Sequence, residues 1–169
     1  MSITAIVYKS NTGFTKEYAR MLGKAEKIKV YSLEKAGQLP AQTQVFYMGP
    51  LMAGHIQGVD QAVKRFAVKG VCGVGMSPAG DQVLASLARS NYVPDAPVFY
   101  LQGGWAPQKV GWLKRRMVNA VTRAVRRQLQ EKKNRTKEEQ TYLDMLLKGG
   151  SFVAFENLEG IRGWLKQQA

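Results

Sequence analysis

Ser2-Ile-Thr-Ala-Ile-Val-Tyr-Lys-Ser-Asn-Thr-Gly-Phe-Thr15 is the stretch of sequence that decides the fold. Ser2–Tyr8 is a short, mostly apolar run rich in β-branched residues, which is typical of a strand buried on both faces. Ser10–Thr15 follows with three hydroxyl side chains and one glycine, and Phe14–Gly23 then has the pattern of a helix. A strand that leads through a polar turn into a helix is typical of an α/β protein with a parallel sheet.

Strand-like and helix-like segments continue to alternate beyond this first unit. Four more strands are predicted, at Lys27–Leu33, Gln44–Met48, Gly70–Gly75 and Val98–Leu101. Two more helices are predicted between them, at Val59–Ala67 and Asp81–Ser90. Because five strands with helical crossovers fit a doubly wound three-layer sandwich, we predict an α/β fold with a five-stranded parallel sheet.

The pattern changes after the fifth strand, where we predict a helical insert at about 106–150 in a single domain that spans residues 1–169. Lys109–Lys133 predicts one helix about 37 Å long. Its apolar residues recur every three or four positions, at Val110, Leu113, Met117, Val121, Val125 and Leu129. We expect Asn134–Arg135 to end this helix.

A second helix of the insert is expected to begin at Thr136, because Thr136-Lys-Glu-Glu139 has the pattern of a capping box. Gly149–Gly150 should end it. Phe152–Phe155 predicts a short extended piece, and Asn157 is expected to cap the terminal helix.

The composition excludes several classes of function. The chain has 169 residues, of which 45% are apolar, with one cysteine, Cys72, and one histidine, His55. A Cys/His zinc site and a disulfide framework are therefore excluded within one chain. Met1–Tyr8 lacks the basic start and long apolar core of a signal peptide, and no stretch approaches the ~20 apolar residues of a membrane span. We expect a cytoplasmic protein.

The positive charge is concentrated in one segment. The net charge is +13, and Lys109–Lys137 holds eleven basic residues and a single acid, Glu131. Three interpretations are open: a solvated polar face, an amphipathic helix with Trp112 on an anionic membrane or an acidic partner, and a contact with nucleic-acid backbone. No nucleic-acid-binding module is visible in the sequence, so we favour the second interpretation, with the protein peripheral at the inner face of the membrane.

Ser10–Thr15 has the composition of a phosphate-binding turn. Backbone amides at the start of a helix favour a phosphate, and the hydroxyls of Ser10, Thr12 and Thr15 add donors. The glycine-lysine ending of a Walker loop is absent, and one glycine, Gly13, stands where a dinucleotide fingerprint needs three. A simple helix cap is the alternative, although capping needs only one such residue.

This motif and two later loops resemble the flavodoxin family. Ser10–Thr15 is similar to the flavodoxin loop that holds the FMN phosphate, while Tyr47–Gly58 and Val74–Pro78 follow the third and fourth strands, where flavodoxins contact the flavin. The resemblance implies the flavodoxin-like strand order 2-1-3-4-5 and FMN as the cofactor. It also implies a binding site made of Ser10, Asn11, Thr12, Gly13, Phe14, Thr15, Pro50, Leu51, Met52, Ala53, Gly54, Gly75, Met76, Ser77 and Pro78.

The second half of the chain resembles one branch of that family. Phe99–Trp105, the basic insert and the final helix are similar to the branch that includes the menaquinone-dependent protoporphyrinogen dehydrogenases, as is Gly54-His55. The resemblance implies an FMN-binding electron-transfer flavoprotein whose partner is a redox protein or a quinone. A quinone-linked protoporphyrinogen dehydrogenase-like oxidoreductase and a basic nucleic-acid-binding module are the alternatives.

Two points stay open from the sequence. Whether the protein is an enzyme is undecided, and no catalytic residue and no metal ligand is assigned. His55 lies beside the predicted crevice, where it either donates a hydrogen bond into the site or is a surface residue.

Overall fold

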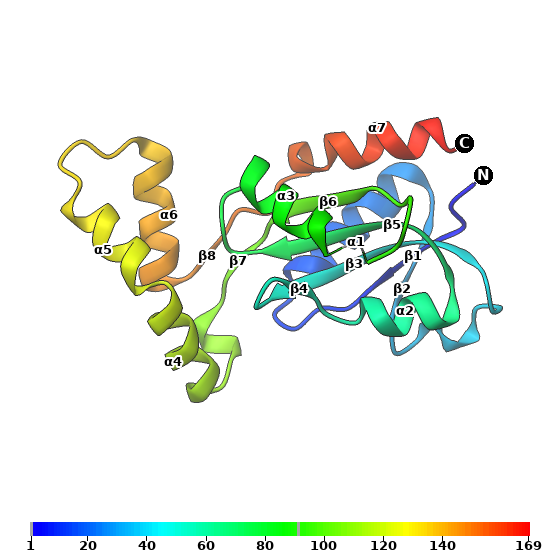
Figure 1. Ribbon diagram of the computed structural model, residues 1–169, viewed down its shortest axis with the longest axis horizontal. Coiled ribbons are helices and arrows are strands. Elements are labelled where there is room, and N and C mark those ends of the chain that lie inside the picture. The colour runs from blue at the N-terminus through cyan, green and yellow to red at the C-terminus, as the bar shows by residue number, and fades with distance from the viewer. Residues whose placement is uncertain (1, 91) are drawn as a thin grey trace. The chain divides into compact units, whose positions relative to one another are not determined.

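Five parallel strands form the central sheet of the protein. The computed structural model describes residues 2–90 and 92–169. In space the strands follow the order β2-β1-β3-β5-β6, which is the flavodoxin-like order of a doubly wound sheet. They are β1 (Ala5–Tyr8), β2 (Lys29–Ser32), β3 (Gln44–Met52), β5 (Ala67–Gly75) and β6 (Val98–Gln102). The prediction of an α/β fold with a parallel central sheet flanked by helices is confirmed (Figure 1).

Helices cover both faces of this sheet and bury an apolar core on each. Helices α1 (Phe14–Glu26) and α7 (Glu159–Gln167) pack on one face, and α2 (Val59–Arg65) and α3 (Asp81–Arg89) pack on the other. Successive side chains of a strand point to opposite faces, so alternate residues of β3 enter the two cores. This explains why the strands are continuous apolar runs rather than alternating ones.

Strand β3 is longer than predicted. The expected strand ended at Met48, but β3 continues through Gly49 and Pro50, which still pair with β5. Leu51 and Met52 then pair with a short antiparallel strand, β4 (His55–Ile56). The expected loop is therefore a hairpin, because β4 supplies the backbone partners that keep the chain extended beyond the sheet.

Residues Gly104–Phe152 form a separate compact unit, here called the helical unit. The short strands β7 (Gly104–Trp105) and β8 (Gly150–Ser151) pair antiparallel where the chain enters and leaves it. Between them lie the 3-10 turn η2 (Pro107–Lys109) and three helices, α4 (Trp112–Val121), α5 (Arg123–Glu131) and α6 (Lys137–Lys148). Contact between α5 and α6 makes this part a helical hairpin.

The prediction of one continuous helix over Lys109–Lys133 is wrong. The helical path begins only at Trp112, since the preceding residue, Gly111, has an extended backbone. It is then interrupted at Thr122, whose hydroxyl donates to the Val118 carbonyl oxygen at 2.8 Å. A threonine that bonds back to the preceding turn often bends a helix, and the apolar spacing alone contained no sign of this.

The end of the helical unit and the C-terminal segment give mixed outcomes. The capping box is confirmed, because the Thr136 side chain accepts from the Glu139 amide and the Glu139 carboxylate accepts from the Thr136 amide. The expected extended piece at Phe152–Phe155 forms no strand, since β8 ends at Ser151; the backbone of Ala154 is extended, and Phe155 already begins a 3-10 helix. Asn157 does not cap α7; it lies in the 3-10 helix η3 (Phe155–Leu158) and donates to the Tyr18 hydroxyl at 2.8 Å.

Met1–Gly103 and Val153–Ala169 form the other compact unit, here called the sheet unit. That the chain behaves as one domain with an insert stays a prediction. Over residues 2–90 and 92–169, no helix has the length and apolar character needed to cross a membrane.

Candidate functional site

The loop after β1 ends at a helix whose first amides lack a side-chain cap. Gly13 is the N-cap of α1 and has a φ of 106°, a left-handed conformation that glycine adopts without strain. Its amide donates to the Ser10 hydroxyl at 3.1 Å, which folds the loop back on itself. Thr15, in the first turn of α1, is only 2% exposed. Backbone amides in this arrangement suit an anion rather than a cation.

A hydrogen-bond chain connects this loop to the β3–β4 hairpin. The Asn11 amide donates to the Gln57 side-chain oxygen at 2.7 Å, and the Gln57 amide nitrogen contacts the Met52 sulfur at 3.1 Å. The Gln57 carbonyl accepts from the Tyr47 hydroxyl at 2.6 Å. Burial raises the pKa of Tyr47, so this hydroxyl stays a donor. The first two predicted loops are therefore in direct contact.

The third loop is fixed by the end of β6. The Gln102 side chain donates to the Met76 carbonyl at 3.0 Å, and the Tyr100 hydroxyl donates to the Ser77 carbonyl at 2.7 Å. The amide of Gly103 donates to the Gly75 carbonyl at 2.7 Å. A side chain at Gly103 would collide with Val74 and Phe14, so the ends of β5 and β6 lie against the first turn of α1.

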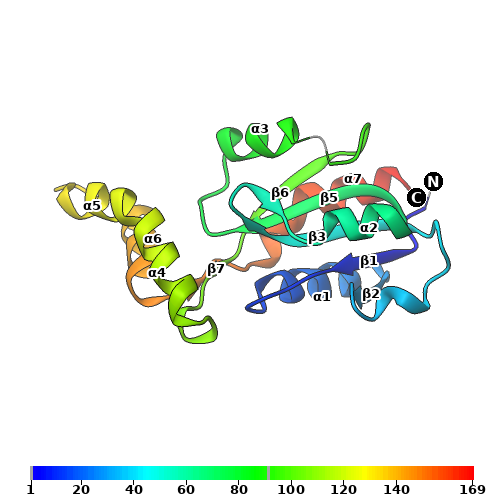
Figure 2. The same ribbon diagram turned by 60° about the horizontal axis from the view of Figure 1, so that its bottom comes forward.

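All three loops leave the carboxyl edge of the sheet, and Figure 2 shows those after β1 and β3 there. A doubly wound sheet binds ligands at this edge, at the point between β1 and β3 where the order of the strands reverses. Thr15 is buried, whereas Asn11, Ala53, Gly54, Ser77 and Pro78 are exposed and the other residues of the predicted site are partly buried. The structure thus brings the three predicted segments together.

The tip of the hairpin is held from the opposite side. Ala53 and Gly54 both have positive φ, as a tight hairpin turn requires. The Tyr92 hydroxyl donates to the Gly54 carbonyl at 3.2 Å and accepts from the Ile56 amide at 3.0 Å. His55 contacts the Asp60 carboxylate at 3.1 Å and the Tyr92 ring. These contacts give His55 a role in holding the hairpin against α2.

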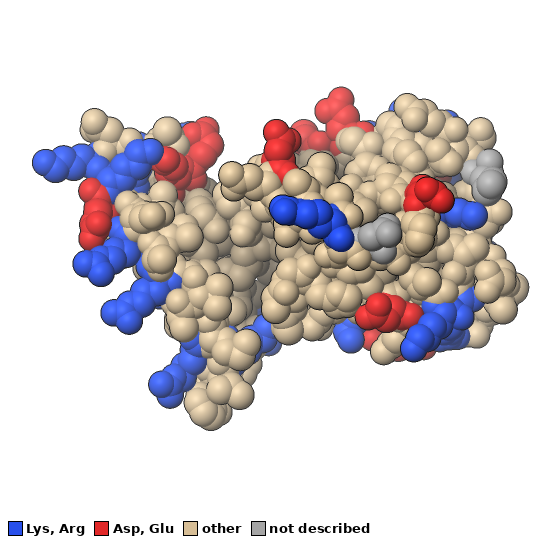
Figure 3. All heavy atoms as spheres, viewed as in Figure 1, with Lys and Arg blue, Asp and Glu red and all other residues tan. Residues whose placement is uncertain are grey.

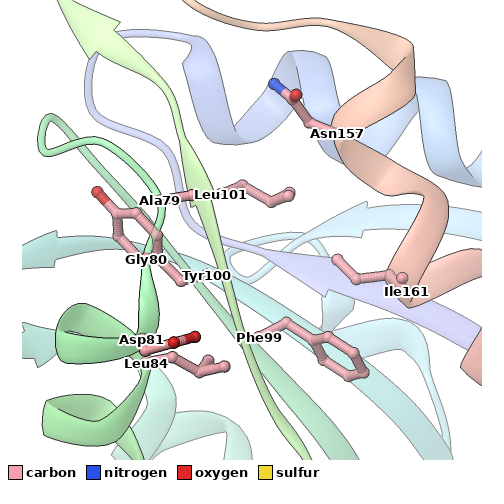
Figure 4. A pocket seen from close by; sticks show the side chains of 10 residues that line it. Ala79, Gly80, Asp81, Leu84, Phe99, Tyr100, Leu101, Asn157 and Ile161 are labelled. Carbon is pink, nitrogen blue, oxygen red and sulfur yellow. The ribbon is translucent and has the colours of Figure 1, made fainter.

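A separate pocket of about 240 Å³ lies along the free edge of β6. It is lined by Ala79, Gly80, Asp81, Leu84, Phe99, Tyr100, Leu101, Asn157, Gly160 and Ile161. As Figure 4 shows, the strand separates Tyr100 from Leu101 and Phe99, and Asn157 points away from Asp81. The polar groups diverge, and none of the residues predicted for the cofactor site lines this pocket.

Burial keeps two of the titratable side chains that lie away from the three loops, Cys72 and Tyr18, protonated. Among residues 2–90 and 92–169, no three His, Cys, Asp or Glu side chains gather to hold a metal ion. Burial raises the pKa of Cys72, which keeps its thiol protonated and unreactive. Burial also raises the pKa of Tyr18, whose hydroxyl donates to the Gln102 carbonyl at 2.7 Å.

Sequence reasoning missed three residues that hold the loops together. Gln57 lies within the quoted stretch Tyr47–Gly58 but carried no signal, because its contact with Asn11 joins residues 46 positions apart. Gln102 could have been found, since it is a polar residue at the carboxyl end of a buried strand. Tyr18 is one of several apolar-face residues of α1, and its partners become visible only in the fold.

The comparisons with known proteins add little beyond the fold. No protein-family model and no curated protein matches the sequence. One solved structure with a similar arrangement is a crystal structure from Bacteroides uniformis described as a "Putative flavoprotein". The two are 10% identical with a TM-score of 0.40, over 68% of this chain and 99% of that one. The fold assignment therefore rests on the sheet order and the crossover helices described above.

Proposed function

We propose that the sheet unit binds FMN and that the protein is an electron-transfer flavoprotein. In this proposal the FMN phosphate lies at Ser10–Thr15, and the flavin ring lies between the β3–β4 hairpin and the loop at Gly75–Pro78. The observation that carries the proposal is the left-handed Gly13 at the uncapped start of α1, at the switch point between β1 and β3.

The residues present fit the two ends of such a cofactor. A phosphate needs several donors, and the first turn of α1 offers backbone amides beside the hydroxyls of Ser10 and Thr15. A flavin ring needs an apolar, partly enclosed slot, and Leu51, Met52 and Met76 are partly buried apolar side chains on the other two loops. Hydrogen-bond donors and apolar side chains of the kinds needed therefore lie at one edge of one sheet, which supports the proposal.

In this proposal the work of the protein is binding and positioning. The flavin ring, when bound, supplies the redox chemistry. Asn11 and Gln57 hold the phosphate loop against the hairpin, so that the two ends of the site keep a fixed separation. Gln102 and Tyr100 donate to the carbonyl groups of Met76 and Ser77, which fixes the backbone of that loop beside the proposed flavin.

No specific observation favours the alternative function, a quinone-linked protoporphyrinogen dehydrogenase-like oxidoreductase. A protoporphyrinogen carries carboxylates, which would need cations in a second pocket close to the flavin. The pocket along β6 instead contains the carboxylate of Asp81. We therefore keep electron transfer as the proposed function and leave the electron donor and acceptor undefined.

Two matched substitutions test the phosphate assignment. Thr15→Val removes a buried hydroxyl with almost no change in volume, and Thr141→Val makes the same substitution at an exposed position of α6 in the helical unit. The loss of one hydrogen bond to a charged group is expected to weaken FMN binding by about 1–3 kcal/mol, or about 5- to 150-fold. Titration of purified apoprotein with FMN, followed by flavin fluorescence, measures the change.

The same titration with riboflavin provides the internal control. Thr15→Val should leave riboflavin affinity unchanged, because riboflavin has no phosphate, and Thr141→Val should leave both affinities unchanged. An equal loss of FMN and riboflavin affinity in Thr15→Val would place the phosphate elsewhere. Wild-type protein that binds neither flavin would overturn the proposed function as a whole.

A further inference from the structure

Helix α4 has an apolar face that the helical unit itself does not bury. No residue of α4 is buried, and the side chains of Leu113, Met117 and Val121 are 61%, 57% and 80% exposed. These three side chains are spaced four residues apart, so they form one stripe along the helix, here called the α4 seam. Trp112, at the start of the same helix, is 67% exposed. Exposed apolar stripes of this kind usually mark an interaction surface.

The α4 seam is bordered by cations without partners. At 3.6 residues per turn, Arg116 lies beside one border of the seam and Lys114 beside the other, with Arg123 just beyond the helix end. Among the described residues, none of these three side chains forms an ion pair. Residues 112–130 contain no acid at all. Figure 3 shows Lys and Arg side chains projecting along the outer rim of the helical unit.

The rest of the helical unit does not need this surface for its own stability. The buried side chains of α6 are Leu143, Met145 and Leu146, and α6 contacts α5, β7 and β8. The Arg135 guanidinium closes the end of α5 by donating to the carbonyls of Leu129, Gln130 and Lys132. The residues of the α4 seam are therefore not among the side chains that the helical hairpin buries.

We propose that α4 binds in the plane of an anionic lipid surface. The α4 seam and Trp112 enter the boundary between headgroups and acyl chains, while Lys114, Arg116 and Arg123 reach the headgroup phosphates. An apolar stripe bordered by long basic side chains is the pattern of an interfacial helix, because the aliphatic stems cover apolar surface while the charges stay in water. The complementary charge of anionic lipid supplies the attraction. This inference does not depend on the flavin site.

Lipid accounts for the surface better than nucleic acid does. A nucleic-acid backbone would satisfy the cations but would leave Leu113, Met117 and Val121 against a polar surface. A helix whose function is phosphate contact alone would gain nothing from three exposed aliphatic side chains on its free face. An anionic lipid surface, with an apolar layer beneath its charges, uses both features.

Co-sedimentation of the full chain with vesicles tests the proposal. One set of vesicles is phosphatidylcholine alone, and the other contains equal parts of phosphatidylcholine and phosphatidylglycerol. The charge variant is Lys114→Gln/Arg116→Gln/Arg123→Gln, and the seam variant is Leu113→Gln/Met117→Gln/Val121→Gln. Arg20→Gln/Lys24→Gln/Lys166→Gln is the matched control, because it removes the same charge from exposed positions of the sheet unit.

The expected result separates the two contributions. Wild-type protein and the control variant should bind the anionic vesicles at low salt, whereas the charge variant should bind about a hundredfold more weakly. The seam variant should bind at least about tenfold more weakly. High salt should weaken wild-type binding. Brominated lipid should quench Trp112 emission, and Trp112→Phe should abolish that quenching, since Trp105 is buried and Trp164 packs against Phe46 and Phe99 in the sheet unit.

Three results would overturn the proposal. The first is wild-type protein that ignores anionic vesicles at low salt. The second is a control variant that loses as much affinity as the charge variant, which would make the binding a property of net charge alone. The third is a seam variant that still binds vesicles like wild type, which would assign the helix to phosphate groups without an apolar layer. Circular dichroism of each variant shows whether α4 is still folded.

Discussion

The two surfaces that we propose for anions, one in the sheet unit and one in the helical unit, differ in the physical origin of the attraction. At Ser10–Thr15 the attraction comes from backbone amides at the start of α1, and their geometry is set by the left-handed Gly13. On α4 the attraction comes from long basic side chains beside an exposed apolar stripe, the α4 seam. Fixed amides can select one phosphate in one orientation, whereas flexible cations favour an extended charged surface.

The sheet unit and helices α4 and α5 also differ in how tightly their side chains are packed. In the sheet unit, Tyr18 and Gln102 join α1 to β6, and Asn157 joins η3 to the same hydroxyl. In α4 and α5 no residue is buried. Substitutions should therefore be tolerated less well in the packed core of the sheet unit than on the exposed helices α4 and α5, because a packed core leaves little room for a change of volume.

The largest effect is expected at Gly58, which sits between the β3–β4 hairpin and α2. Its φ is 80°, and a Cβ at this position would collide with the Tyr47 hydroxyl. Gly58→Ala should therefore lower the free energy of unfolding by about 2–5 kcal/mol, from backbone strain and overpacking together. Urea unfolding followed by circular dichroism measures it.

Two other glycines sharpen this test. Gly54 has a similar φ of 77° but open space around it, so Gly54→Ala should cost only about 1 kcal/mol of strain. Gly111, before α4, has open space and an ordinary φ of −65°, so Gly111→Ala should change stability by less than about 0.5 kcal/mol. Equal effects at Gly58 and Gly111 would contradict the division between a tightly packed and a tolerant region.

The sequence predicted the regular elements of the sheet unit but not the features that depend on distant contacts. Each of the five parallel strands and three crossover helices was found, because continuous apolar runs and turn residues act locally. The hairpin beyond Met48 was missed, because it depends on β4 and on Tyr92, which lies 36 positions from Ile56. The break at Thr122 was missed because helical periodicity does not report side-chain bonds to the backbone.

The candidate site shows the same limit. Ser10–Thr15 was recognisable, since its hydroxyls and glycine stand between a strand and a helix. The bridge from Asn11 to Gln57 was not, because any of several polar residues on the hairpin could have met that loop. The exposure of the α4 seam was also beyond the sequence: the helical spacing of its apolar residues favoured partial packing on the domain, but these side chains are exposed.

A smaller, local effect is expected at the start of α6. Thr136→Ala removes the cap and should weaken this helix by about 1 kcal/mol. The hydrogen bonds from Lys132 and the Thr136 amide hold the pKa of Glu139 below its ordinary value of 4.5. Because the folded pKa is the lower one, this stabilisation is present above pH 4.5 and is lost as the pH falls through the folded value.

Amide hydrogen exchange in α6 measures both effects. Protection of the Glu139 and Gln140 amides should fall in Thr136→Ala at neutral pH, and it should fall in wild type on acidification. Glu139→Gln should remove most of the acid dependence of this local protection. An acid dependence that persists in Glu139→Gln would show that another group controls the helix start.

The most direct test of the central claim compares FMN with riboflavin on the wild-type protein. If Ser10–Thr15 holds a phosphate through the amides of α1, apoprotein should bind one FMN per chain and should bind riboflavin far more weakly. Isothermal titration calorimetry gives both affinities and the stoichiometry. Equal affinities for the two flavins, or no binding of FMN, would contradict the account.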